Sequence, residues 1–66
     1  MRITYGIKGH TCGHVSGHFV NDVGASLQEA ADWIVNRTRK ACGADSRIGW
    51  TVQLWRDGEI VYRHTY

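Results

Sequence analysis

Three Gly-His tetrads follow one another between positions 9 and 20, and they gather the residues of this chain whose chemistry is most distinctive. The cluster holds three of the four histidines and one of the two cysteines, and its candidate metal ligands are His10, Cys12, His14 and His18. Imidazole nitrogens and thiolate sulfurs are ligands that zinc prefers. The first three alternate along the chain, so a strand would direct them to one side. His18 or Cys42 would then complete a tetrahedral set.

The spacing of these residues does not match a known zinc motif, because paired ligands with a distant mate are missing. His14 and His18 have the four-residue separation that serves zinc on a helix, but the intervening glycine argues against a helix. A polar strand face or a glycine-rich loop is the alternative interpretation. We therefore expect no cofactor, with a zinc-stabilised mini-domain as the alternative. Without a metal, the histidines would form a hydrated face that gains charge below a pH of about 6.5.

An enzymatic function is disfavoured by the same residues. Cys12 could act as a nucleophile with His10 or His14 as its base, but nothing at a recognisable spacing orients that base. The glycines of the tetrads are not followed by the Gly-Lys-Ser/Thr of a phosphate-binding loop. A chain of 66 residues can barely enclose a substrate pocket. We predict a protein that is not an enzyme.

Large aromatic side chains beside arginines are the second chemical signal. Tryptophan and arginine are the residue types that most often anchor protein–protein interfaces. On this ground the candidate partner-binding residues are Trp33, Arg37, Trp55, Arg56 and Arg63. Aromatic rings among cations can also stack bases and contact phosphates. The cations for such binding are Arg37, Arg39, Lys40 and Arg47 around the helix end and Arg56, Arg63 and His64 on the hairpin, with Trp55, Tyr62 and Tyr66 between them. The formal net charge of +2 is small for a nucleic-acid-binding protein.

Size and composition indicate one small domain, residues 1–66. No apolar stretch approaches the roughly 20 residues of a membrane span, and the first residues lack the apolar run of a signal peptide. We therefore expect a cytoplasmic protein without a membrane partner. Two free thiols are the default for such a compartment, and a disulfide between Cys12 and Cys42 is the alternative if the compartment is oxidising.

A helix is predicted to begin after Ser26. Ser26 and Glu29 form a capping box, and Gly43 is typical of a left-handed residue that ends a helix. Between them lies an apolar stripe at helical spacing: Leu27, Ala31, Ile34 and Thr38. Trp33 lies off this stripe, between Glu29 and Arg37.

Two β-rich runs, 50–55 and 59–66, flank an Asp57-Gly58 pair that predicts a hairpin. We expect a type I turn with a bulge at Gly58, because this register puts the apolar residues on one face. The expected cross-strand pairs are Trp55–Glu59, Leu54–Ile60, Val52–Tyr62 and Trp50–His64. The outer face would then carry Thr51, Gln53, Trp55, Val61, Arg63 and Thr65.

The N-terminal stretch alternates as well, with Ile3, Tyr5, Ile7, Val15 and Phe19 in one parity. A single strand over 2–19 would span about 60 Å, far more than a domain of this size. The chain therefore turns near 10–13, or else one strand at 2–8 precedes a glycine-rich loop. The expected fold is α+β, with a single helix on a three- or four-stranded, mainly antiparallel sheet, in the order βαββ or ββαββ.

The first functional hypothesis is a non-enzymatic binding protein that docks on a larger protein or complex and inhibits or adapts it. In size and make-up the chain is similar to small proteins of phages and mobile elements, among them inhibitors of bacterial defence systems (anti-CRISPR-like proteins). That similarity transfers no residue. The second hypothesis is a nucleic-acid-binding module that uses the basic and aromatic positions.

Overall fold

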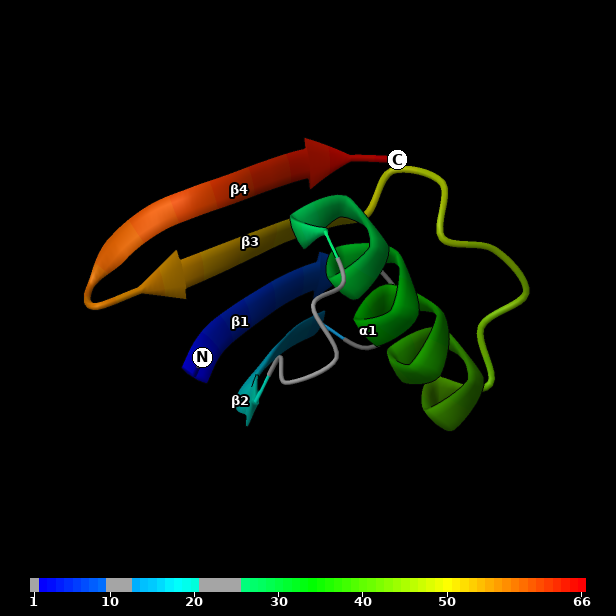
Figure 1. The fold of residues 1–66 in the computed structure, drawn as a ribbon. Coiled ribbons are helices and arrows are strands. Elements are labelled where there is room, and N and C mark those ends of the chain that lie inside the picture. Colours follow the sequence, from blue (N-terminus) through cyan, green and yellow to red (C-terminus); the bar gives the residue numbers. More distant parts are fainter. Residues whose placement is uncertain (1, 10–12, 21–25) are drawn as a thin grey trace.

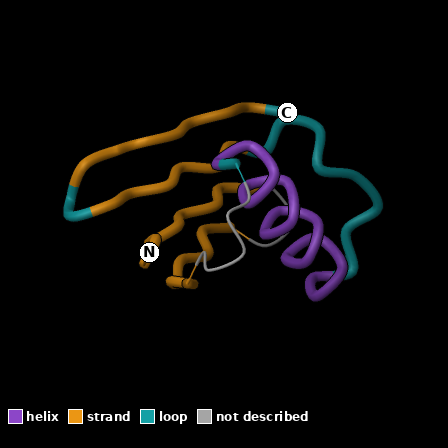
Figure 2. The backbone as a smooth tube through the Cα atoms, in the orientation of Figure 1, coloured by secondary structure: helices purple, strands orange, loops and turns teal. Residues whose placement is uncertain are grey.

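The fold is α+β, with one helix packed against a four-stranded antiparallel sheet (Figures 1 and 2). The computed structural model describes residues 2–9, 13–20 and 26–66. In chain order the elements are β1 (Arg2–Gly9), β2 (Gly13–Val20), α1 (Leu27–Cys42), β3 (Thr51–Arg56) and β4 (Glu59–Thr65). The strand order across the sheet is β2-β1-β3-β4. The helix covers one face, and no element among the described residues covers the other.

The helix α1 has the predicted ends. The Ser26 hydroxyl accepts the backbone N–H of Glu29 at 3.2 Å, and Gly43 adopts a left-handed φ of 72°. The face turned to the sheet carries Ala30, Ala31, Ile34 and Val35, all buried. No helix in the described ranges is long and apolar enough to cross a lipid bilayer.

The N-terminal strands form the hairpin expected from parity. Ile3 pairs with Phe19 and Ile7 with Val15. Ile3 and Ile7 are fully buried, and Phe19 packs against the core from the edge strand. The prediction that the chain turns after position 9 and keeps its parity is therefore confirmed, and the four-stranded version of the sheet is the one that forms.

Trp50 is the largest side chain of the core and is 0% exposed. Its ring lies against Gly9, where an added Cβ would come within 2.5 Å of the ring carbon Cε2. Glycine at this position is thus a packing requirement, because the ring occupies the space that a side chain would fill. Among the described residues, the Nε1–H group of Trp50 has no hydrogen-bond acceptor.

The predicted register of the C-terminal hairpin is wrong. Asp57 and Gly58 both have positive φ, 53° and 82°, which is the two-residue turn that splays the strands least. The turn therefore pairs Arg56 with Glu59 and Trp55 with Ile60. The observed pairs beyond it are Leu54–Tyr62, Gln53–Arg63, Val52–His64 and Thr51–Thr65.

The extra residue lies at Val61 rather than at Gly58, because the register shifts between Leu54 and Trp55. One bulge in either place gives the same parity on β3 and after Val61, so Leu54 and Val52 still face the helix, where both are fully buried. Ile60, predicted to face Leu54 on the core side, instead pairs with Trp55 on the outer face. Val61 itself is partly buried against the core and does not belong to the outer face. That part of the prediction is also wrong.

The C-terminal Tyr66 joins the sheet to the helix. Its hydroxyl donates to Asp32 Oδ1 at 2.5 Å, and its backbone N–H donates to the carbonyl of Trp50 at 2.8 Å. The guanidinium of Arg47 lies over the Tyr66 ring, 4.3 Å from its centroid, and donates to Asn36 Oδ1 at 3.2 Å. Hydrogen bonds and a cation–π contact thus connect side chains of the helix, of the loop after it and of the end of the chain.

The hydrogen bond from Tyr66 to Asp32 makes the free energy of unfolding depend on pH in the alkaline range. Burial, the hydrogen bond to Asp32 and the charge of Asp32 raise the pKa of Tyr66 above its usual value of 10.0. The folded protein keeps a proton that the unfolded chain releases, so this stabilisation is complete below a pH of about 10 and is lost as the pH rises towards the folded value. We expect the free energy of unfolding to fall over that range in urea titrations.

Tyr66→Phe should remove this alkaline slope and lower the free energy of unfolding by about 1–2 kcal/mol at neutral pH, since one hydrogen bond to a carboxylate is lost. A variant that keeps the full slope would contradict the assignment to Tyr66.

The expectation of free thiols is wrong for Cys42, which is disulfide-bonded. Cys12, the one other cysteine of the chain, lies outside the described residues. Zinc is bound by thiolate, and a disulfide sulfur has no thiolate to offer. Cys42 in this state is therefore not the closing ligand of a zinc site.

Candidate functional site

The open face of the sheet, here called the outer face, is mostly polar. Its positions follow from the cross-strand pairs and the alternation of each strand. They are Arg2, Thr4, Gly6 and Lys8 on β1, His14, Ser16, His18 and Val20 on β2, Thr51, Gln53 and Trp55 on β3, and Ile60, Arg63 and Thr65 on β4. Asp and Glu are absent from these strand positions.

Trp55 lies across the centre of the outer face. Its ring atoms Cη2 and Cζ3 come within 3.0 and 3.1 Å of the point where a Cβ on Gly6 would stand. Nε2 of His14 is 3.7 Å from the same point. Glycine is unfavourable inside a strand, but here it lets the indole extend from β3 over β1. Because Gly6 is buried while Trp55 is only partly so, the ring covers the sheet on one side and remains accessible on the other.

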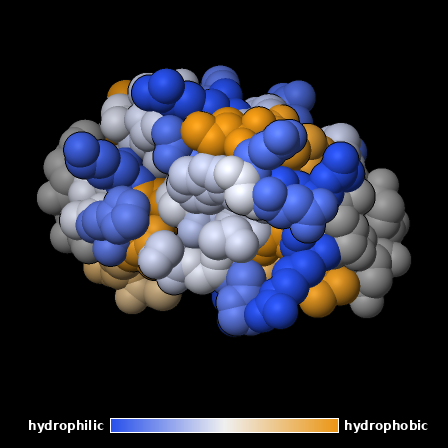
Figure 3. Space-filling model, turned by 90° about the vertical axis from the view of Figure 1, so that its left-hand side faces the viewer, coloured by the Kyte–Doolittle hydropathy of each residue, from blue (hydrophilic) through white to orange (hydrophobic). Residues whose placement is uncertain are grey.

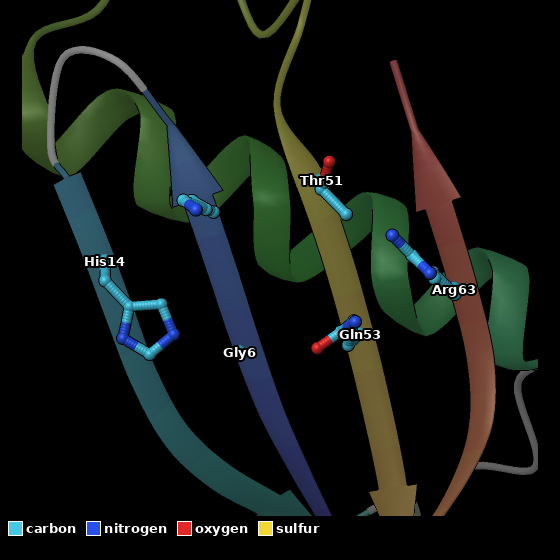
Figure 4. Close-up of a pocket in the computed structure, with 6 residues that line it drawn as sticks. Gly6, His14, Thr51, Gln53 and Arg63 are labelled. Carbon is cyan, nitrogen blue, oxygen red and sulfur yellow. The ribbon is translucent and has the colours of Figure 1, made fainter.

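A hollow of about 380 Å³ adjoins this ring. We call it the sheet hollow; it is lined by Gly6, Lys8, His14, Thr51, Gln53 and Arg63. Figure 4 shows His14 directed from β2 towards β1 and Arg63 directed from β4 towards β3, so the two edge strands point side chains inward. Gly6 is part of the lining, and the Trp55 ring covers the position that its side chain would take.

The sheet hollow combines positive charge with neutral hydrogen-bonding groups. Lys8 and Arg63 are cations at neutral pH, and His14 adds an imidazole that can take part in hydrogen bonds. Thr51 and Gln53 supply a hydroxyl and an amide between them. Such a lining suits an anionic oxygen, since charged donors make the stronger hydrogen bonds to it.

The five predicted partner-binding residues do not form one surface. Trp55 and Arg63 lie on the outer face, as predicted. Arg56 pairs with Glu59 next to the turn and lies on the opposite side of the sheet from Trp55. Trp33 and Arg37 are on α1, behind the sheet in the view of Figure 4.

Trp33 and Arg37 make a small site of their own. Trp33 is 57% exposed, and the Arg37 guanidinium lies 5.3 Å from the centroid of its ring. With Asn36 and Lys40 they line a hollow of about 250 Å³.

The four predicted metal ligands are only half described. His10 and Cys12 lie outside the described residues. His14 and His18 are four residues apart on β2, which separates them by about 13 Å along the strand. Both histidines are on the outer face of the sheet. Within the residues described, no group of three or more His, Cys, Asp or Glu side chains is placed to hold a metal ion.

The aromatic residues of β4 lie on the helix side of the sheet. Tyr62 pairs with Leu54 and His64 with Val52, both of which face the core. The His64 and Tyr66 rings meet edge to face at 4.6 Å between centroids. Tyr62 and Tyr66 therefore do not share a surface with Trp55 and Arg63.

Lys8, Thr51 and Gln53 were not predicted as site residues. The signal for Lys8 was in the sequence, since it has the even parity of His14 and thus the same face once the chain turns after Gly9. Its position beside Thr51 follows from the pairing of β1 with β3. That pairing joins segments more than forty residues apart, which local pattern does not reveal.

Exposed apolar residues are scattered over the surface. Val20 and Ile60 are 59% and 55% exposed on the outer face, and Ile48 is 70% exposed in the loop after α1. Seen from the side of the β3–β4 turn, apolar groups alternate with hydrophilic ones (Figure 3). This distribution favours a mixed contact surface over a broad hydrophobic one.

Comparisons with protein-family models, with curated proteins and with solved structures found no match for this chain.

Proposed function

We propose that this protein is a non-enzymatic module that binds single-stranded nucleic acid through the outer face of its sheet. The observation that carries the proposal is Trp55, whose ring lies over Gly6 on a face without Asp or Glu at its strand positions. An indole held in this way offers a stacking surface to an unpaired base. Lys8 and Arg63, on the same face, are placed for the backbone phosphates that flank it.

The face also suits a single strand better than a duplex. Base stacking on a protein ring needs an unpaired base whose π-face is free, which a duplex does not present. A four-stranded sheet with strands about 4.8 Å apart is roughly 14 Å wide between its edge strands, enough for a strand of a few nucleotides.

The test is a titration of fluorescently labelled oligothymidylate, read by anisotropy at several salt concentrations. Arg2, Lys8 and Arg63 are the permanent cations of the outer face. If all three contact phosphates, the logarithm of the affinity should fall with the logarithm of salt with a slope of about −2, since each contact contributes about −0.7 for single strands. A duplex of equal length should bind more weakly. Equal affinity for duplex and single strand, or an affinity independent of salt, would contradict the proposal.

A second candidate function is docking on a larger protein through the helix. The observation that favours it is Trp33, 57% exposed beneath the Arg37 guanidinium on the side of the molecule away from the outer face. Trp and Arg are the residue types that anchor protein interfaces. Inhibition of a bacterial defence system by a phage-encoded protein is the biological setting that chain size suggests. Such a contact would survive Trp55→Ala and be lost in Trp33→Ala.

Cytoplasmic localisation stays a prediction for both functions. The disulfide at Cys42 is the observation that argues against it, because disulfides persist mainly in oxidising compartments. Measuring in cell extracts whether Cys42 is oxidised would decide between a cytoplasmic and an oxidising compartment.

A further inference from the structure

We infer that the edge strand β2 pairs with β2 of a second copy of this chain, so that two sheets join into one of eight strands. The pairing is independent of the proposed function, because it involves an edge of the sheet and not its outer face. β2 and β4 are the two edge strands (Figure 1). The outward N–H and C=O groups of an edge strand can bind a further strand unless charges, proline or bulges prevent it.

β2 has none of these protections. Its eight residues, Gly13–Val20, include no Asp, Glu, Lys, Arg or Pro. It pairs with β1 along its whole length without a register shift. A long and regular edge strand without charged side chains is a site at which another strand can add.

β4 is protected in two ways. Glu59 and Arg63 put charged side chains on this strand, and a register shift at Val61 interrupts its pairing with β3. Charges and bulges are the features by which natural proteins keep an edge strand from pairing. The sheet therefore has one edge suited to pairing, and association through that edge alone stops at two copies.

The side chains of β2 match a second β2 in antiparallel orientation. A two-fold axis through Gly17, perpendicular to the sheet, would pair Val15 of each copy with Phe19 of the other. Both residues are partly buried on the helix side of the sheet, and β-branched and aromatic residues stabilise a sheet when they are opposite each other. On the outer face, Ser16 would pair with His18. Apolar residues thus meet apolar ones, and polar residues meet polar ones.

Aromatic side chains lie beside this axis on the helix side of β2. The hydroxyl of Tyr5, on β1, is 2.7 Å from the point where a Cβ on Gly17 would stand, so the ring extends over β2. The rings of Tyr5 and Phe19 are 6.2 Å apart between centroids. Two such aromatic pairs, one from each copy, would flank the axis and bury apolar surface there.

The pairing brings no like charges together on adjacent strands. The cations nearest to β2 in the sheet are Arg2 and Lys8 on β1. The two β1 strands of the dimer would be three strand spacings apart, about 14 Å, which exceeds the screening length of about 8 Å at physiological ionic strength. The two outer faces would become continuous, with the two Trp55 residues on strands about 24 Å apart.

The first test is sedimentation velocity of the protein without nucleic acid, over a wide range of protein concentrations. We expect an equilibrium between monomer and dimer, with no larger species. Amide hydrogen exchange, followed by NMR, identifies the edge that pairs. Exchange should slow in β2 as the dimer forms and should stay unchanged in β4.

Charged variants provide the second test. Ser16→Lys combined with His18→Lys would place lysines opposite each other in the dimer, and the dissociation constant should rise at least about 10-fold. Ser16→Glu combined with His18→Glu should have the same effect. An equimolar mixture of the two double variants should restore the dimer, because each lysine then faces a glutamate. The matched control is Ile60→Lys combined with Thr65→Lys, two exposed positions of β4, which should dimerise like the parent protein.

Four results would overturn the edge pairing: a monomer at every concentration, exchange protection in β4, equal dimerisation of the lysine variant of β2, or a dimer that persists in denaturant until a reductant is added. The exchange measurement on the parent protein decides even where a variant does not fold, which circular dichroism detects. A monomer would leave the nucleic-acid proposal in place. A dimer through β2 that binds no oligonucleotide would contradict that proposal and support the edge pairing.

Discussion

Gly9→Ala should lower the free energy of unfolding by about 2–3 kcal/mol, a large share of the stability of so small a domain. The new methyl group would meet three ring atoms of Trp50 at 2.5 to 2.8 Å, and Trp50 is completely buried and has no free space to enter. Urea denaturation followed by circular dichroism measures the loss. Gly13→Ala is the matched control, since its Cβ would meet nothing within 4 Å and would cost only about 1 kcal/mol through its φ of 72°.

A double-mutant cycle shows whether the Trp50 ring is the cause. Phenylalanine at that position has a smaller ring and no buried N–H, so Gly9→Ala should cost at least about 1 kcal/mol less in the Trp50→Phe background. An equal cost in both backgrounds would mean that Gly9 is required for another reason.

Trp55→Ala should weaken oligothymidylate binding by about 5- to 150-fold, because stacking on an aromatic ring contributes about 1–3 kcal/mol per base. The fold should persist, since the ring lies on the outer face and its removal leaves no cavity in the core. Anisotropy titration of the labelled oligonucleotide measures the effect. Trp33→Ala, which removes an exposed ring from the helix, should bind as tightly as the parent protein.

Gly6→Val offers an independent route to the same result. Its side chain would occupy the position now covered by the Trp55 ring, 3.0 Å from Cη2, and would push the ring off the sheet. Binding should weaken although every predicted contact residue is still present. Unchanged affinity in both Trp55→Ala and Gly6→Val would refute the stacking role.

Elements fixed by local chemistry could be predicted from the sequence. The helix begins and ends where the Ser26 hydroxyl and the left-handed Gly43 satisfy its terminal backbone groups. The N-terminal hairpin followed from parity and from the length limit of the domain. Both signals operate over a few residues and do not depend on what packs against them.

In the C-terminal hairpin, the apolar pattern and the turn residues favour different registers, and the turn residues determine the observed one. The sequence pattern placed the bulge at Gly58, but Asp57 and Gly58 both accept positive φ and form the tighter two-residue turn. The bulge then moved to Val61, which can turn towards the core from an irregular position. Parity survived because the number of bulges did not change, so Trp55 and Arg63 were still assigned to the correct face.

The sheet hollow could not be predicted, because it depends on which strands become neighbours. Lys8 and Arg63 belong to strands that do not touch, separated by β3 in the sheet order. Their common surface exists because β1 pairs with β3, a contact between the two ends of the chain. Sequence parity assigns each residue to a face but does not say which residues on that face are close together.

The contact between Gly6 and Trp55 has an evolutionary consequence. A side chain at position 6 and an indole at position 55 compete for one volume above the sheet, so the two positions should change together among relatives of this chain. A lineage that gains a β-branched residue at position 6 gains strand propensity and loses the stacking ring. Relatives that bind nucleic acid in this way should therefore be recognisable by a glycine in the first strand that co-varies with an aromatic residue in the third.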